Sequence, residues 1–113
     1  LMRATLEAAR GTGCAACVLA PEVPVAHLRD GLLVDAWPGA AVGVSQTPQA
    51  YSRDALQAMS RHAETQGCRP QSTMQLALLA GQAVRAVPGE KTNLKLTTAE
   101  DLLLASGLRG LLQ

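Results

Sequence analysis

Aromatic side chains are almost missing from this 113-residue chain, which has no phenylalanine, one tryptophan and one tyrosine. Trp37 and Tyr51 are too few to build the stacking platform with which proteins hold single-stranded nucleic acids. An excess of one charge is also lacking: Lys and Arg total 10, Asp and Glu total 9, and the formal net charge is +1. Because no basic stripe is present to neutralise a row of phosphates, we expect no nucleic-acid partner.

Long hydrophobic runs are equally scarce. No apolar stretch approaches the roughly 20 residues that cross a bilayer, and no charged segment followed by an apolar one opens the chain. We therefore expect a cytoplasmic protein with no membrane partner. The three cysteines are an odd number, which favours reduced thiols over a disulfide framework.

Two of the cysteines have a spacing that calls for interpretation. Cys14 and Cys17 form a C-x-x-C pair, as in redox and zinc sites, but no second ligand pair follows them in the sequence. Free cysteine is commonly a small buried residue. We interpret the pair as part of a buried strand and predict no metal site, with a metal or redox role as the alternative.

An apolar share of 48% is sufficient for a hydrophobic core, and the length suits one domain or part of one. The sequence opens on an amphipathic helical stretch without an N-cap, which ends at the glycines near residue 12. Residues 14–20 form a continuous run of small apolar side chains, as in a strand of a parallel sheet that is buried on both faces. A helix followed by a buried strand predicts an α/β fold.

Residues 21–38 follow a different pattern. Apolar positions alternate on both sides of a turn at Asp30 and Gly31, which predicts a β-hairpin. An isolated hairpin is marginally stable in water. We therefore expect a protruding arm that packs on a partner subunit; a hairpin folded back on its own domain is the alternative.

The remaining sequence predicts alternating strands and helices. A strand is expected over residues 41–44, and a helix that Ser52 caps follows it. Ser72 and Gln75 form a capping box for a short helix, and a short strand covers residues 83–87. Residues 93–97 are predicted to form the end of a strand, after which Thr97 and Glu100 would cap the last helix.

Two segments are more specific than this periodicity requires. The first is Gln46-Thr47-Pro48-Gln49-Ala50-Tyr51, placed between an expected strand end and a helix start, where open α/β sheets bind their ligands. The second runs from Val87-Pro88-Gly89 to Asn93-Leu94-Lys95-Leu96-Thr97-Thr98-Ala99-Glu100-Asp101-Leu102. Lys95 would lie at the end of a strand, with an apolar stem and a cationic head that suits a phosphate.

Together the two segments resemble the 2-C-methyl-D-erythritol 4-phosphate cytidylyltransferase family, whose motifs read Q-T-P-Q-A-F and V-P-G followed by N-I-K-I-T-T-P-E-D-L. The resemblance covers nearly the whole chain and implies the C-terminal part of a Rossmann-like nucleotide-diphosphosugar transferase fold with a protruding β-arm. It implies transfer of CMP from CTP to a polyol phosphate by a homodimer, with Mg²⁺ in the complete enzyme. Lys95 then corresponds to the catalytic lysine, and Gln46, Thr47 and Gln49 to substrate-binding residues.

Departures from the family pattern limit what the resemblance implies. The glycine-rich P-A-A-G-x-G-x-R-M segment that cradles the triphosphate is absent, so we expect the N-terminal CTP-binding half to be missing and residues 1–113 to be inactive alone. The arm reads Pro21-Glu22-Val23-Pro24-Val25, the expected arginine falls near Gly39, and Gln71-Ser72-Thr73 replaces T-D-D. A non-catalytic homologue that serves in assembly and a pentitol-phosphate cytidylyltransferase therefore remain alternatives.

Overall fold

The computed structural model describes residues 1–111, and its centre is a mixed sheet with the strand order β4-β1-β5. β1 (Cys14–Leu19) runs antiparallel to β4 (Val44–Tyr51) and parallel to β5 (Val84–Pro88). The parallel pairing expected for residues 14–20 is therefore found with β5 alone, while the pairing with β4 is antiparallel. An unbroken apolar run reports burial on both faces of a strand, and it carries no information about the direction of the neighbouring strands.

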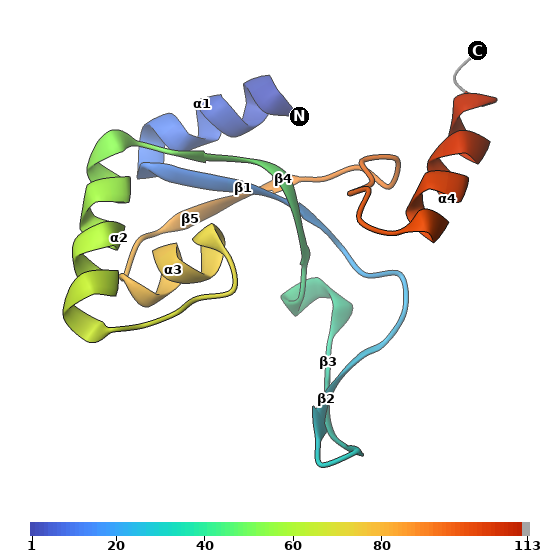
Figure 1. Cartoon of the computed structure of the whole chain (residues 1–113), viewed down its shortest axis with the longest axis horizontal. Coiled ribbons are helices and arrows are strands. Elements are labelled where there is room, and N and C mark those ends of the chain that lie inside the picture. The colour runs from blue at the N-terminus through green and yellow to red at the C-terminus, as the bar shows by residue number, and fades with distance from the viewer. Residues whose placement is uncertain (112–113) are drawn as a thin grey trace.

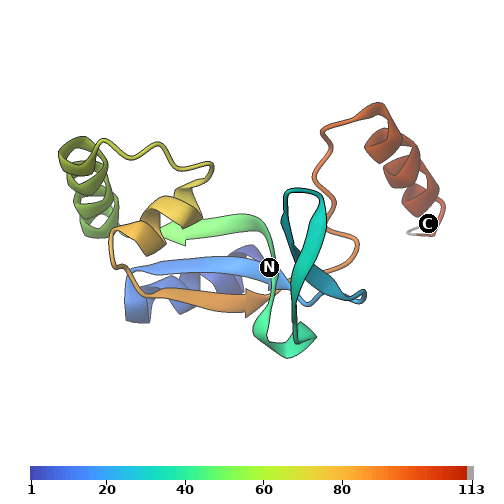
Figure 2. The ribbon, with the colours of Figure 1, turned by 90° about the horizontal axis from the view of Figure 1, so that it is seen from below.

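Helices cover both faces of this sheet (Figures 1 and 2). α1 (Met2–Thr12) packs on one face, where Ala15 and Cys17 form a core cluster with Val87. α2 (Arg53–Gln66) and α3 (Thr73–Leu79) lie over the other face and bury Ala55, Met59 and Ala77. The α/β layer architecture is confirmed.

The predicted hairpin is present over residues 21–38. β2 (Val25–Arg29) and β3 (Leu32–Trp37) pair in an antiparallel two-stranded sheet, and the turn uses positive φ angles of 51° at Asp30 and 78° at Gly31. The hairpin projects away from the central sheet (Figure 1), and every residue of β3 is exposed.

α4 (Ala99–Arg109) also stands apart from the sheet, and none of its residues is buried (Figure 1). The radius of gyration is 16.4 Å, against about 13 Å for a compact chain of roughly this length. The helix begins one residue later than predicted: the capping box uses Thr98 and Asp101 in place of Thr97 and Glu100. Within residues 1–111, no helix has the length and the apolar character that spanning a membrane requires.

Two predicted strands are wrong in position. Residues 39–41 form a short 3₁₀ helix, η1 (Gly39–Ala41), and the strand that follows, β4, contains the whole Gln46-to-Tyr51 segment. Residues 93–97 form no strand; they belong to a loop between β5 and α4. An apolar pattern alone cannot make a strand, since a strand also needs a neighbouring strand with which to pair.

The two cysteines of the C-x-x-C pair are fully buried on β1, as the structural interpretation predicted. Successive side chains of a strand point to opposite faces, so Cys17 shares the α1 face with Ala15 while Cys14 belongs to the α2 face. Thr5, buried on α1, places its hydroxyl oxygen 3.1 Å from the Cys17 sulfur. Thiols on opposite faces of a sheet cannot bind one metal ion or join in a disulfide.

Candidate functional site

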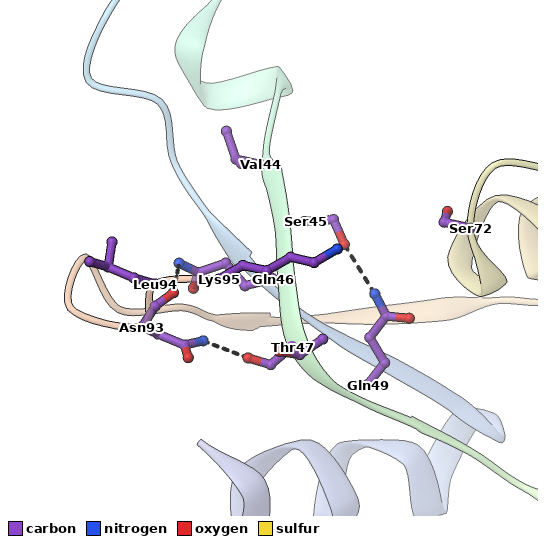
Figure 3. A pocket seen from close by; sticks show the side chains of 9 residues that line it. All are labelled: Val44, Ser45, Gln46, Thr47, Gln49, Ser72, Asn93, Leu94 and Lys95. Carbon is purple, nitrogen blue, oxygen red and sulfur yellow. Dashed lines mark hydrogen bonds between the residues drawn. The ribbon is translucent and has the colours of Figure 1, made fainter. Parts of the chain in front are cut away.

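A pocket of about 400 Å³ lies where β4 meets the loop between β5 and α4 (Figure 3). β4 supplies one wall and the loop supplies the other, while the start of α3 contributes Ser72. The pocket brings together all four residues predicted from the sequence. The residues that line it are Val44, Ser45, Gln46, Thr47, Gln49, Ser72, Asn93, Leu94 and Lys95.

Lys95 reaches the pocket from the loop. Its side chain extends across β4 toward the side on which Ser45 and Gln49 lie (Figure 3). The prediction that Lys95 lies at the end of a strand is wrong, because residues 93–97 are loop. Lys95 does line the pocket, so its ammonium group is available to an anion there.

β4 is irregular where it lines the pocket. Its register with β1 shifts between Ala16 and Cys17: Ala16 pairs with Gln49, whereas Cys17 pairs with Gln46. Thr47 and Pro48, joined by a cis peptide bond, occupy the interval between these partners. This bulge places Gln46, Thr47 and Gln49 at one pocket although they are not spaced as a regular strand would require.

Gln49 is oriented by a hydrogen-bonded chain along β4. The Tyr51 hydroxyl donates to Gln49 Oε1 at 2.8 Å, and Gln49 Nε2 donates to the Ser45 hydroxyl at 3.2 Å. Burial, and after it the neighbouring Cys14, raises the pKa of Tyr51, which keeps the phenol protonated as a donor. Since Ser45 accepts from Gln49, its own proton is available to an acceptor in the pocket.

Gln46 differs from Gln49 because its side-chain nitrogen donates two hydrogen bonds within the protein, whereas that of Gln49 donates one. Gln46 Nε2 donates to the carbonyl oxygens of Glu90 at 2.9 Å and of Asn93 at 3.2 Å, and its Oε1 accepts from the Glu90 amide at 3.1 Å. The Asn93 side chain in turn donates to the Thr47 carbonyl oxygen. Gln46 therefore joins the two walls of the pocket.

Sequence reasoning did not single out Ser45, Ser72 or Asn93 as lining residues. Ser45 and Asn93 lie inside or beside the two recognised segments, so their position near those motifs was the available signal. Ser72 was predicted as a helix cap and as part of the Gln71-Ser72-Thr73 departure from the family pattern, and its hydroxyl does accept from the Gln75 amide at 3.1 Å. Its place in the pocket depends on the packing of α3, which no local pattern reports.

The donor set of the pocket determines what it can bind. In the described part of the chain, the lining contains one cation, hydroxyls and amides, and no carboxylate. Among residues 1–111, no group of three or more His, Cys, Asp or Glu residues is placed to hold a metal ion. The pocket thus suits an oxygen-rich anion such as a phosphate, whereas Mg²⁺ is usually held by one or two carboxylates, which this lining does not contain.

A comparison with protein families finds a match over residues 3–109, to the family described as 2-C-methyl-D-erythritol 4-phosphate cytidylyltransferase. The match includes both walls of the pocket and most of the chain.

This chain belongs to that family.

Individual relatives agree with the assignment to the cytidylyltransferase family. The "Bifunctional enzyme IspD/IspF" of Desulforudis audaxviator is 36% identical over 115 residues, covering 95% of this chain and 27% of its own length. The 2-C-methyl-D-erythritol 4-phosphate cytidylyltransferase of Bacillus licheniformis is 29% identical, covering 91% of this chain and 45% of its own length. The chain thus spans between about a quarter and a half of these curated relatives.

The cytidylyltransferase fold is also found among solved structures. The 2-C-methyl-D-erythritol 4-phosphate cytidylyltransferase of Thermus thermophilus matches with a TM-score of 0.81 and 30% identity. The match covers 97% of this chain and 55% of that protein. The α/β fold with a mixed sheet is therefore shared with a member of this family.

Proposed function

We propose that the chain is the C-terminal part of a cytidylyltransferase that transfers CMP from CTP to 2-C-methyl-D-erythritol 4-phosphate, in isoprenoid precursor biosynthesis. The observation that supports this most is the shared pocket: Lys95, Thr47 and Gln49, which come from two separate motifs, line one cleft. The order of these motifs, Q-T-P-Q before N-L-K-L-T, supports the placement in the C-terminal part of the family's domain.

The pocket would bind the phosphate of the polyol substrate. That phosphate attacks the α-phosphorus of CTP, a new P–O bond forms, and the bond to the leaving pyrophosphate breaks. Negative charge grows on the non-bridging and leaving oxygens, so catalysis depends on positioning and on cationic stabilisation. Lys95 supplies the cation, while the Thr47 hydroxyl and the Gln49 amide orient the phosphate.

Magnesium is part of what family membership suggests, but the described residues offer no carboxylate ligands at the pocket. We therefore derive no catalytic step through a metal ion. The roles assigned to Lys95, Thr47 and Gln49 are those of positioning and of stabilising charge on phosphate oxygens.

The β2–β3 hairpin would join two copies of this chain in a cytoplasmic homodimer. Its support is the exposure of apolar side chains on the arm: Leu28 is 63% exposed, Leu32 69% and Leu33 73%. A two-stranded hairpin gains little stability by itself. Covering these leucines with a partner subunit removes apolar surface from water, which favours association.

A different polyol phosphate is the second candidate substrate. The positions at which the family pattern departs include Ser72, which lines the pocket, and Gly39, where an arginine is expected. A pentitol phosphate would fit a site whose substrate contacts have changed. A homologue that acts only in assembly is the third candidate.

Titration of the chain with 2-C-methyl-D-erythritol 4-phosphate and with a pentitol phosphate, followed by amide NMR shifts, tests these candidates. We expect amide shifts at Ser45, Thr47 and Asn93, and we expect 2-C-methyl-D-erythritol 4-phosphate to bind more tightly than the pentitol phosphate. If neither ligand shifts the amide signals of these residues, the assembly role is favoured. Because the triphosphate-binding segment is absent from these residues, we also expect no CTP-dependent pyrophosphate release by this chain alone, and detectable turnover would contradict this.

A further inference from the structure

The loop that carries Lys95 has little regular structure to hold it. Residues 89–98 form neither helix nor strand. The loop is fixed at its start, where the Gly89 amide donates to the Val18 carbonyl oxygen at 2.8 Å. At its end the Thr97 amide donates to the Asp101 carboxylate at 2.9 Å, which joins the loop to α4, a helix that stands apart from the sheet. The backbone that presents Lys95 lies between these two points, and other contacts are needed to hold it against the sheet.

Gln46 makes most of the intermediate contacts. Its side chain bonds both backbone groups of Glu90 and the carbonyl oxygen of Asn93, which lies two residues before Lys95. In the other direction, the side-chain amide of Asn93 donates to the carbonyl oxygen of Thr47. Each wall of the pocket therefore holds the other through a side-chain amide, as Figure 3 shows for Gln46, Thr47 and Asn93.

Gly89 is the reason that the loop can approach Gln46 so closely. A Cβ atom at this position would lie 2.2 Å from Gln46 Oε1 and 3.1 Å from the Val18 carbonyl carbon. The second neighbour is backbone and cannot move aside. The loop and the Gln46 amide can form this arrangement only when residue 89 is a glycine.

The exposed ion pair in the same loop is a weaker tether. Lys91 pairs with Glu22 at the base of the hairpin, and both side chains are 67% exposed. Exposed ion pairs contribute little because water screens the charges and two long side chains lose freedom. The ion pair therefore does not replace the amide contacts.

We infer that Gln46 and Asn93 form a lock between β4 and the loop, and that this lock positions Lys95 over the pocket. Gln46 is then a positioning residue and not a substrate ligand, because its amide protons and its oxygen are used within the protein. The inference rests on the proposed function for the identity of the ligand, a phosphate. The structural claim stands on the hydrogen bonds alone.

Amide hydrogen exchange and ¹⁵N relaxation of the 113-residue chain test the lock directly. Gln46→Leu keeps the size of the side chain and removes its hydrogen bonds. We expect exchange at the Glu90 amide to accelerate by about tenfold or more, the equivalent of about 1.4 kcal/mol. We expect the order parameter at Lys95 to fall below about 0.6. Gln57→Leu, the same change at an exposed position of α2, should alter neither quantity.

Binding of inorganic phosphate provides the second readout. We expect Gln46→Leu and Asn93→Ala each to weaken phosphate binding by about fivefold or more, while Gln57→Leu binds as the unaltered chain does. Asn93→Ala tests the lock from the loop side, and it decides the matter if Gln46→Leu does not fold.

The outcomes separate the lock from the proposed function. Unchanged Glu90 exchange and Lys95 order in both variants overturn the lock. A more mobile loop with unchanged phosphate affinity overturns the positioning role. If the unaltered chain does not bind inorganic phosphate, the phosphate pocket is wrong, and the relaxation data still decide whether Gln46 and Asn93 hold the loop.

Discussion

Replacing the Lys95 ammonium group with an uncharged side chain is the most direct test of the proposed chemistry. Lys95→Met keeps the apolar stem and removes only the charge. At about 4 Å from a phosphate oxygen, one unit charge contributes about 4 kcal/mol at an effective dielectric constant near 20, but only about 1 kcal/mol in bulk water. Lys95 is exposed in this structure. The size of the loss therefore reports whether the working site excludes water.

We expect Lys95→Met to lower kcat by at least roughly a hundredfold, since one preorganised charge contact is typically worth about 3–4 kcal/mol in a transition state. The assay is pyrophosphate release from CTP and 2-C-methyl-D-erythritol 4-phosphate by an enzyme that contains this chain together with a CTP-binding part. Lys91→Met is the matched control, because Lys91 lies in the same loop but is not among the residues that line the pocket. A loss of only about fivefold, equal in the two variants, would remove Lys95 from the mechanism.

Three further predictions concern the scaffold. Hydrogen bonds from Thr97 and Thr98 lower the pKa of Asp101 from 3.8 to about 2, so the stabilisation of α4 is complete above pH 3.8 and declines as the pH falls toward 2. The α4 amide shifts should follow this titration, and Asp101→Asn should abolish it. Met59 of α2 is 1% exposed, so Met59→Ala should lower the free energy of unfolding in urea by about 2–5 kcal/mol; an unchanged midpoint would contradict this packing. A thiol reagent should modify Cys68 well before Cys14 and Cys17, since those two are fully buried and burial raises the pKa of Cys14. Rapid and complete labelling of all three thiols would show that β1 is not protected.

The hairpin and the helix caps illustrate what local sequence can predict. Asp30 and Gly31 tolerate positive φ, and apolar residues alternate around them, so turn and strands follow from adjacent residues alone. Ser52 caps α2 as predicted, by accepting from the Ala55 amide at 3.1 Å. The one-residue error at α4 arose because Thr97 and Thr98 are both capable caps, and the choice between them depends on which hydroxyl accepts from a helix amide; that of Thr98 accepts from the Asp101 amide at 3.2 Å.

The lysine loop illustrates what local sequence could not predict. Residues 93–97 have the apolar alternation of a strand, yet in the part of the chain that the structure describes they pair with neither edge strand of the β4-β1-β5 sheet. The loop is held instead by Gln46, whose contacts with Glu90 join positions 44 residues apart. A pattern that spans a few residues contains no information about such a contact.

The sequence by itself determined the family, the α/β class, the hairpin and four residues that line one pocket. Motifs retain their order, and turns and caps depend on neighbours in the chain. Only the tertiary structure decided the mixed direction of the strands, the engagement of Gln46 within the protein and the addition of Ser45, Ser72 and Asn93 to the pocket. These features arise from contacts between segments that are distant in the chain, because strand partners and amide partners are chosen when the segments pack together.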